Sequence, residues 1–428
     1  MSNSSIILVG CIASVAAFLT ACGGDDSSGE PDNPSETGGA AGAAGAAGAA
    51  GVAGGAGTGG SPDPVPDAGG GSAGGDTGGA GGSAQPEAGQ GGNGGEDADV
   101  PPQTVVEFVE GVEVSTLAGS DTPGFIDGSA DSALFHNPVN VLASSSGIFV
   151  ADFENGAIRR LTPNGQVETV FQDGALMRPF GLIESAQGEL FVEADGNTGG
   201  AVDSTTGTIW RIQPDTGEGE VVAENIGRPR GLAWSSDDRL VMADLRAHII
   251  RILDPDTGEV VDLAGMDDEP GFADGSGSAA RLQYPYGMAW MPSGDLVFAD
   301  QGNHAVRVVT MQGEVSTLAG TGAPGMVDGD VDVAMFFEPK DIAVAEDGTI
   351  YVSDSGNQRI RSISADGQVR TVAGDGVAGY LNGAGSEAEF FGQEGLDLTS
   401  DGTGLIVADG NKGEPLPYNR IRLVLFAP

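Results

Sequence analysis

The sequence predicts an all-β fold, a six-bladed β-propeller over residues 104–428. The first observation is a unit of four short β-runs that recurs six times, at a spacing of roughly 40 to 55 residues that is typical of propeller blades. The second is that the last unit lacks its fourth run. The third is that residues 111–119, which precede the first unit, match a fourth run, as the closing strand of a ring should.

Each unit is predicted to form four antiparallel strands. In the fourth unit these strands cover residues 285–290, 296–300, 305–309 and 314–320, which are β-branched or alternating runs bounded by Gly, Asp or Pro. The six first strands are expected to begin at Pro138, Pro179, Pro229, Pro285, Pro339 and Gln393. Second strands end in an aspartate in five units, at Asp152, Asp244, Asp300, Asp354 and Asp409. Third strands carry an arginine, at Arg159, Arg251, Arg307, Arg361 and Arg422.

This unit resembles the NHL repeat. The segment Val-Ser-Asp-Ser-Gly-Asn-Gln-Arg-Ile-Arg at residues 352–361 nearly reproduces the family pattern, and the resemblance covers essentially all of residues 104–428. It implies a propeller of NHL type. We expect the repeated arginines to pair with the aspartates at nearby second-strand ends, which is a structural role.

The ring is predicted to close through its two ends. The last unit stops after its third strand, at residues 423–426, whereas residues 111–119 match the fourth strand at 313–320. We predict that residues 111–119 pair into the last blade. This pairing removes an open sheet edge, which would otherwise template aggregation.

The N-terminal segment predicts export and lipidation. An apolar run over residues 6–19 is too short to cross a bilayer comfortably, and it leads into Leu-Thr-Ala-Cys, which resembles a bacterial lipobox. The resemblance implies a signal peptide over residues 1–21 and a lipid on Cys22. It also implies a position at the outer membrane or cell surface of a Gram-negative bacterium, with the periplasmic face as the alternative. The lipid is the predicted membrane contact.

Residues 22–103 are predicted to be the lipidated cysteine followed by a disordered tether. They are mostly Gly, Ala, Ser, Pro and acidic residues, with hardly any large apolar side chain. Such a segment cannot bury enough apolar area to offset the entropy that ordering would cost.

The propeller is predicted to be strongly acidic. The chain has 62 acidic and 18 basic residues, and 12 of the acidic ones but none of the basic ones precede residue 104. Residues 104–428 therefore hold 50 acidic and 18 basic residues, a net charge of −32. Because such a surface repels phosphate backbones, we expect no nucleic-acid partner.

One face of the predicted ring carries the long connections. Turns alternate between the two faces of a blade, so the second-to-third loops and the links between blades share one face. Four links, at residues 124–135, 271–282, 325–336 and 379–390, share a template that contains Asp-Gly or Asn-Gly, then Ala, then Phe or Leu. We call the side with these links the long-loop face and expect any local function there. The template Ala and Phe are expected to pack a one-turn helix over the neighbouring blade.

Residues near the start of each first strand are expected to surround the channel mouth on the long-loop face. The candidate ligand-binding residues are Asn140, Phe180, Arg230, Tyr286, Lys340, Asp341 and Glu394. Aromatic and mixed charged groups in a ring suit a small polar ligand or a peptide end. Inert filling of the channel is the alternative that the sequence leaves open.

Three aspartates in one link are weak candidate calcium ligands. Asp328, Asp330 and Asp332 alternate and offer carboxylate oxygens, although the glycine of an EF-hand loop is missing, and a solvated acidic loop is the alternative. Zinc lyases of this fold use three histidines, of which only His248 has a counterpart here. Arg230 stands where lactonase-like propellers place an asparagine ligand. We therefore predict no catalytic residue and no required cofactor.

Together these features predict a membrane-anchored, extracytoplasmic scaffold for binding or protein interaction. Its partner is expected to be a protein, a peptide or a glycan. A metal-dependent lyase or lactonase-like propeller enzyme is the alternative.

Overall fold

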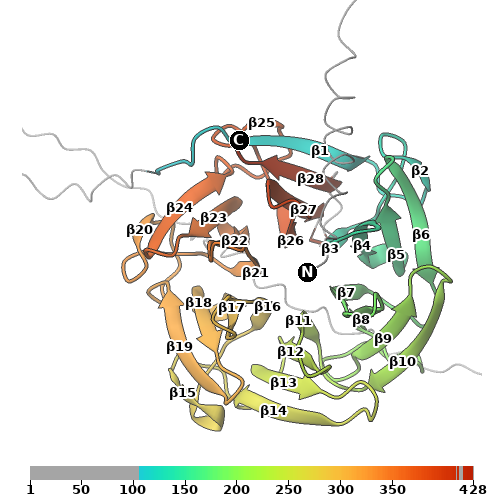
Figure 1. The fold of residues 1–428 in the computed structure, drawn as a ribbon, viewed down its shortest axis with the longest axis horizontal. Helices are drawn as coiled ribbons and strands as arrows, with labels where there is room; N and C mark the ends of the chain where they lie inside the picture. Colours follow the sequence, from blue (N-terminus) through green and yellow to red (C-terminus); the bar gives the residue numbers. More distant parts are fainter. Residues whose placement is uncertain (1–105, 411, 414–417, 428) are drawn as a thin grey trace, which may run out of the picture. The chain divides into compact units, whose positions relative to one another are not determined.

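The structure is a computed structural model that describes residues 106–410, 412–413 and 418–427, and these residues form six antiparallel sheets arranged in a ring (Figure 1). The first blade consists of β3 (Pro138–Ser144), β4 (Gly147–Asp152), β5 (Ala157–Leu161) and β6 (Gln166–Gln172), from the inside outward. The predicted six-bladed propeller is confirmed. The predicted signal peptide, the lipid site at Cys22 and the tether lie outside the described residues.

The next four blades repeat this order. Blade two contains β7 (Pro179–Glu184), β8 (Leu190–Ala194), β9 (Thr208–Gln213) and β10 (Glu218–Glu224). Blade three contains β11 (Pro229–Trp234), β12 (Leu240–Asp244), β13 (Ile249–Leu253) and β14 (Val260–Gly265). Blade four contains β16 (Pro285–Trp290), β17 (Leu296–Asp300), β18 (Ala305–Val309) and β19 (Glu314–Ala319). Blade five contains β21 (Pro339–Val344), β22 (Ile350–Asp354), β23 (Arg359–Ile363) and β24 (Gln368–Ala373). In these blades, as in the first, the innermost strand begins at the predicted proline.

The sixth blade joins the two ends of the described chain. Its strands are β26 (Gly392–Leu398), β27 (Gly404–Gly410), β28 (Asn419–Leu425) and, from the start of the domain, β1 (Glu113–Ser120). β1 and β28 pair antiparallel, with Val114 opposite Val424 and Ser115 opposite Leu423. Figure 1 shows β1 lying beside β28 at the rim of the ring. The predicted closure is confirmed.

The four templated links add a short fifth strand to the outside of a blade. These strands are β2 (Gly128–Ser129), β15 (Gly275–Ser276), β20 (Gly329–Asp330) and β25 (Gly383–Ala384). The predicted one-turn helix is wrong for most of them, because in the described residues only one link contains a 3-10 turn, η2 (Gly277–Ala279). The prediction that the template side chains pack is confirmed, since Phe135, Phe336 and Phe390 are fully buried. Burial of each Phe stabilises the fold by about 1.5 to 3 kcal/mol.

Each third-strand arginine is held between two partners from different parts of its blade. Arg159 Nη1 lies 2.8 Å from Asp152 Oδ2 at the end of β4, as predicted, and its Nη2 lies 2.6 Å from Asp127 Oδ1 in the link. Arg307 and Arg361 repeat this arrangement. The arginine therefore fixes the link to the blade.

Three further 3-10 turns follow second strands: η1 (Phe153–Asn155), η3 (Gln301–Asn303) and η4 (Ser355–Asn357).

The hydrophobic core lies between neighbouring blades. Side chains of the second strands, such as Phe149, Phe191 and Phe298, are fully buried. Because successive side chains of a strand point to opposite faces of its sheet, each blade offers apolar groups to both neighbours. Within the described part of the chain, no helix combines the length and the apolar character that a membrane crossing requires.

Candidate functional site

The first turn of each innermost strand fills the centre of the ring. Five residues form what we call the plug layer. They directly follow the strand-starting prolines of blades two to five and Gln393 of blade six, and they are Phe180, Arg230, Tyr286, Lys340 and Glu394. All five are buried, with relative exposures between 3% and 9%. The sequence left open whether these residues bind a ligand at the channel mouth or fill the channel, and in the structure their large complementary side chains meet at the axis.

The plug layer is held together by aromatic and ionic contacts. The rings of Phe180 and Tyr286 pack edge to face, with their centroids 5.5 Å apart. The Arg230 guanidinium lies 4.3 Å from the Phe180 ring centroid, and Lys340 Nζ lies 5.7 Å from that of Tyr286. Lys340 also pairs with Glu394. These contacts continue around the ring, so each plug side chain is fixed by a neighbour.

Arg230 is fully engaged by buried carboxylates of blade two. Its Nη1 lies 2.8 Å from Asp195 Oδ1 and 3.0 Å from Glu193 Oε2. Burial raises the pKa of Glu193 to about 8, although the charge of Arg230 lowers it in part. Arg230 therefore has a structural role in the plug layer, and its charge is balanced within the protein.

The next position of the innermost strands is mostly glycine. It is occupied in blade order by Asn140, Gly181, Gly231, Gly287, Asp341 and Gly395. A Cβ atom added to Gly287 would lie 1.8 Å from Asp341 Oδ1. The glycine is therefore required for the Asp341 carboxylate to lie where it does. Four of the six are glycines, and a Cβ added at any of them would lie within 3.0 Å of a neighbouring innermost strand, so these glycines let the strands approach closely beside a cavity just beyond the plug layer.

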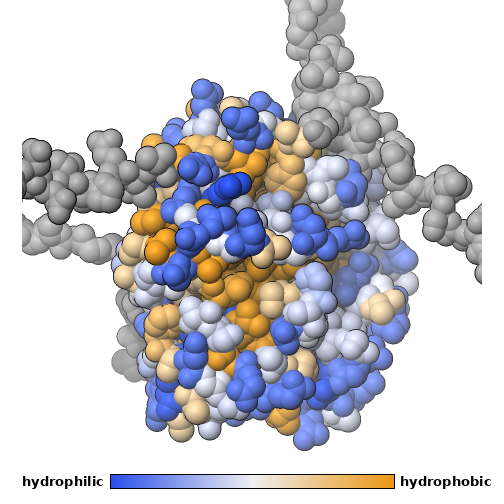
Figure 2. Space-filling view, turned by 60° about the vertical axis from the view of Figure 1, so that its left-hand side comes forward, coloured by the Kyte–Doolittle hydropathy of each residue, from blue (hydrophilic) through white to orange (hydrophobic). Residues whose placement is uncertain are grey.

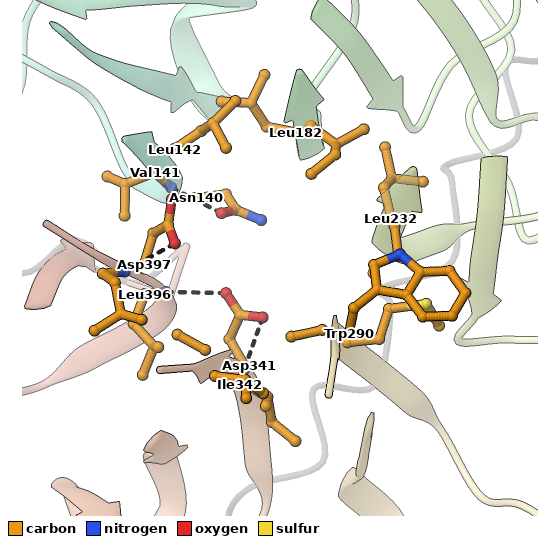
Figure 3. Close-up of a pocket in the computed structure, with 18 of the residues that line it drawn as sticks. Asn140, Val141, Leu142, Leu182, Leu232, Trp290, Asp341, Ile342, Leu396 and Asp397 are labelled. Atoms are coloured by element: carbon orange, nitrogen blue, oxygen red, sulfur yellow. Dashed lines mark hydrogen bonds between the residues drawn. The ribbon is translucent and has the colours of Figure 1, made fainter. Parts of the chain in front are cut away.

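This cavity has a volume of about 440 Å³ and occupies the centre of the ring (Figure 3). Its walls are mainly apolar and come from all six innermost strands: Leu142, Leu182, Leu232, Trp234, Met288, Trp290, Ile342, Leu396 and Leu398. These residues follow the plug layer along strands that run from the long-loop face to the first hairpin turns. The cavity therefore lies toward the opposite side, which we call the hairpin face. The sequence placed the working surface on the long-loop face, where the plug layer blocks the channel.

Two carboxylates stand in this apolar cavity. Asp341 Oδ2 accepts the backbone N–H of Leu396 at 2.9 Å, and its Oδ1 accepts that of Ile342 at 2.9 Å. Asp397 accepts two backbone N–H groups in the same way, each at 2.8 Å. Burial raises the pKa of Asp341 to about 7 and that of Asp397 to about 6. The backbone donors fix both groups and favour their ionised forms against the cost of burial.

Asn140 completes the polar part of the cavity. Its Oδ1 accepts the backbone N–H of Val141 at 2.7 Å, so its amide nitrogen is the end left to donate. Figure 3 shows Asn140 and Asp341 pointing into the same space. The predicted set is thus divided by the structure, because Asn140, Arg230 and Asp341 line the cavity. The lining does not include the other four residues of the set, Phe180, Tyr286, Lys340 and Glu394. Whether any of them binds a ligand stays a prediction.

Three cavity-lining residues were not predicted from the sequence as site residues: Asp397, Trp234 and Trp290. The two tryptophans occupy the same position in neighbouring repeats, the last residue of β11 and of β16. Trp290 Nε1 donates to the backbone oxygen of Trp234 at 2.8 Å, which fixes its ring in the cavity wall. Comparison of this position across repeats would have indicated both tryptophans, and both line the cavity.

The candidate metal ligands are separated in the structure. Asp328 Oδ1 lies 2.5 Å from Arg361 Nη2, and Asp330 accepts a hydrogen bond from Gln368, whereas Asp332 is exposed. In the ranges that the structure describes, no three or more His, Cys, Asp or Glu side chains are grouped as metal ligands. Asp328 instead pairs with the third-strand arginine of its blade. This role explains why an Asp or Asn recurs at its position in each link.

Comparisons with known proteins agree with this architecture. Residues 128–327 match the family described as SMP-30/Gluconolactonase/LRE-like region, and residues 336–361 match the NHL repeat. The protein SUPPRESSOR OF QUENCHING 1, chloroplastic, of Arabidopsis thaliana is 28% identical over 301 residues, covering 61% of this chain and 28% of that protein. NHL repeat-containing protein 2 of Bos taurus is 27% identical over 331 residues, covering 64% and 45% respectively. The chain thus spans less than half of the length of either relative.

Solved structures share the fold at low sequence identity. An auxiliary nutrient binding protein from Bacteroides ovatus superimposes with a TM-score of 0.58 and 19% identity, covering 73% of this chain and 76% of that one. A protein of the same description from Bacteroides thetaiotaomicron gives a TM-score of 0.59 and 17% identity, with the same coverage. From its repeated unit, its closed ring of six blades and these matches, we conclude that the chain forms a six-bladed β-propeller that contains an NHL repeat and is similar to NHL repeat-containing proteins.

Proposed function

We propose that this chain is an extracytoplasmic binding protein, and that its propeller holds a small organic ligand in the channel cavity. The observation that carries the proposal is the cavity itself. Its volume of about 440 Å³, its apolar walls and its few fixed polar groups are the features of small-molecule sites in proteins. The plug layer closes one end, so a ligand enters from the hairpin face.

The cavity is organised before any ligand arrives. Asp341 and Asp397 are each fixed by two backbone N–H groups, and Trp290 is fixed by its hydrogen bond to Trp234. A site whose polar groups are already oriented loses little conformational entropy on binding. This rigidity supports a role in recognition.

The test uses the full chain with Cys22→Ser, so that no lipid is attached. We expect fragments from a small-molecule library to bind by ligand-observed NMR and to change the tryptophan fluorescence, because Trp234 and Trp290 are two of the three tryptophans. Val344→Trp, which fills the cavity from its wall, should abolish binding, and Val261→Trp on the exposed side of β14 should not. Hits that bind Val344→Trp unchanged would show that the cavity is not the site.

The second part of the proposal is display at the cell envelope on a lipid anchor. It is supported by the lipobox-like sequence that ends at Cys22 and by the Gly/Ala-rich segment that follows it. Bacterial cells that express the full chain and are fed an alkyne-tagged fatty acid should yield a labelled protein. Cys22→Ser should remove the label, and labelling that survives this change would contradict the anchor.

The match over residues 128–327 favours a second candidate, hydrolysis of a lactone. Arg230 occupies the position where lactonase-like propellers place an asparagine ligand, so this candidate needs another ligand set. Turnover of gluconolactone by the full chain with added calcium, lost in Asp341→Asn, would support the enzyme over the binding protein.

A further inference from the structure

The charged groups that line the cavity do not balance. Four charged residues contribute to the lining: Glu184, Arg230, Asp341 and Asp397. Arg230 forms ion pairs with Glu193 and Asp195 of blade two. Glu184 accepts a hydrogen bond from the Ser144 hydroxyl at 3.1 Å. Neither Asp341 nor Asp397 forms an ion pair within the described residues. The lining therefore offers two carboxyl groups that have no counter-charge among the described residues.

Asp341 differs in this respect from the other buried acids of the propeller. Nine acidic residues of the described chain are buried, and eight of them form an ion pair with an arginine or a lysine. Asp341 is the ninth, and it is the one that projects into the cavity (Figure 3). A buried carboxylate without a counter-charge is costly, and elsewhere this fold supplies an arginine or a lysine to prevent that cost.

From this contrast we propose that the ligand of the cavity is an organic cation, an amine carried on an apolar body, with Asp341 and Asp397 as its counter-ions. The inference rests on the proposed binding function and names its ligand class. Each carboxylate oxygen accepts one backbone N–H and retains a further lone pair for an ammonium group. The leucines and the indole of Trp290 then contact the apolar body, and an aromatic face also attracts a cation.

An organic cation fits this lining better than a bare metal ion. A hard divalent ion takes six or more oxygen ligands at short range. In this cavity both oxygens of each aspartate already accept a backbone donor, Asn140 directs its nitrogen inward, and most of the other lining side chains are apolar. An ammonium group needs only a few acceptors, and its apolar substituent uses the rest of the volume.

The proposal is tested with matched triplets of an amine, an alcohol and a carboxylate. Suitable triplets share a phenyl, an indole or a hexyl body, for example phenethylamine, phenethyl alcohol and hydrocinnamate. Affinities are measured by calorimetry on the full chain with Cys22→Ser. Charge-assisted hydrogen bonds predict that the amine of the best-fitting body binds at least about tenfold more tightly than its alcohol, and that the carboxylate binds more weakly still.

Variants of the two aspartates test which carboxylate binds the ammonium group. Asp341→Asn should lower the affinity for the amine to that for the alcohol and leave the alcohol unchanged. Asp397→Asn is the second test should Asp341→Asn fail to fold. Asp215→Asn, at an exposed turn of the hairpin face, is the matched control and should change neither affinity.

Two failures can be told apart. Equal affinities for amine, alcohol and carboxylate would overturn the cationic ligand while the binding function stands. Absence of binding for every triplet, with no change in tryptophan fluorescence, would overturn the binding function itself and this inference with it.

Discussion

Ser115 of β1 lies opposite Leu423 of β28, so a residue near the start of the propeller pairs with a residue near its end. Seven residues of β1 find a partner in β28, from Glu113 to Ser120. The blade that joins the chain ends is therefore made by residues far apart in sequence. β1 thereby covers the edge of β28, which would otherwise be free to pair with another chain.

Removal of residues 106–117 should lower the melting temperature by at least about 10 °C or make the protein insoluble, because Val112 and Val114 are buried and the outer edge of β28 would be exposed. Thermal unfolding followed by circular dichroism measures the effect. Deletion of residues 23–95, in the predicted tether, is the control and should leave the melting temperature unchanged. An unaltered transition after loss of residues 106–117 is incompatible with closure by β1.

Arg361→Ala should reduce the free energy of unfolding by about 3 kcal/mol or more, because it leaves the buried carboxylates of Asp354 and Asp328 without their cation. Arg160→Ala is the matched control. Its partner Glu168 is partly exposed, so the expected loss is below about 1 kcal/mol. Denaturant titration compares the two, and similar losses would remove the special role of the buried network.

Asp341 should make the free energy of unfolding fall as the pH rises. Burial raises its pKa from 3.8 to about 7, so the folded state holds the proton more tightly than the unfolded chain. This contribution to stability is complete below about pH 4 and is lost as the pH rises through about 7. Asp397 acts in the same direction because burial raises its pKa to about 6.

The sign can be checked against Asp341→Asn. Between about pH 5 and pH 8, the free energy of unfolding of the unmodified chain should fall relative to that of the variant by more than about 1 kcal/mol. Groups common to both proteins, such as His248 and His304, cancel in this comparison. A constant difference across the range would mean that Asp341 is not desolvated.

His304 should tolerate asparagine better than alanine. Its backbone is left-handed, with φ of 52°, and its Nδ1 accepts the backbone N–H of Glu338 at 3.2 Å. Asparagine adopts this conformation readily and offers an acceptor, whereas alanine does neither. We expect a loss of about 2 kcal/mol for His304→Ala and less than about 1 kcal/mol for His304→Asn in denaturant titrations. Equal losses would show that the ring is retained for its packing against Phe337.

The repeat made most of the fold predictable. A proline at the start of an innermost strand, an aspartate at the end of the second and an arginine in the third recur in sequence, so their positions and the pairing of Arg159 with Asp152 could be anticipated. The second partner of Arg159, Asp127, was not predicted, because the Asp-Gly in the link was interpreted as a turn. The short strands such as β2 were missed for the same reason.

The cavity was less predictable than the blades. Five side chains from five repeats meet at the axis, and their combined volume decides whether the channel is open or filled. A sequence read one repeat at a time shows Phe180 and Tyr286 separately, not that their rings touch. It also does not show that Gly287 makes room for Asp341, whose nearest neighbours come from another blade. The side of the ring on which the cavity lies could therefore be determined only from the structure.

The position of a bound amine tests the account most directly. A crystal of the full chain with Cys22→Ser, soaked with para-bromophenethylamine, locates the ligand by the anomalous scattering of bromine. We predict one dominant bromine site within the walls formed by Leu232 and Trp290, with the ammonium group on Asp341. A dominant site on the long-loop face, or an empty cavity at saturating amine, would contradict it.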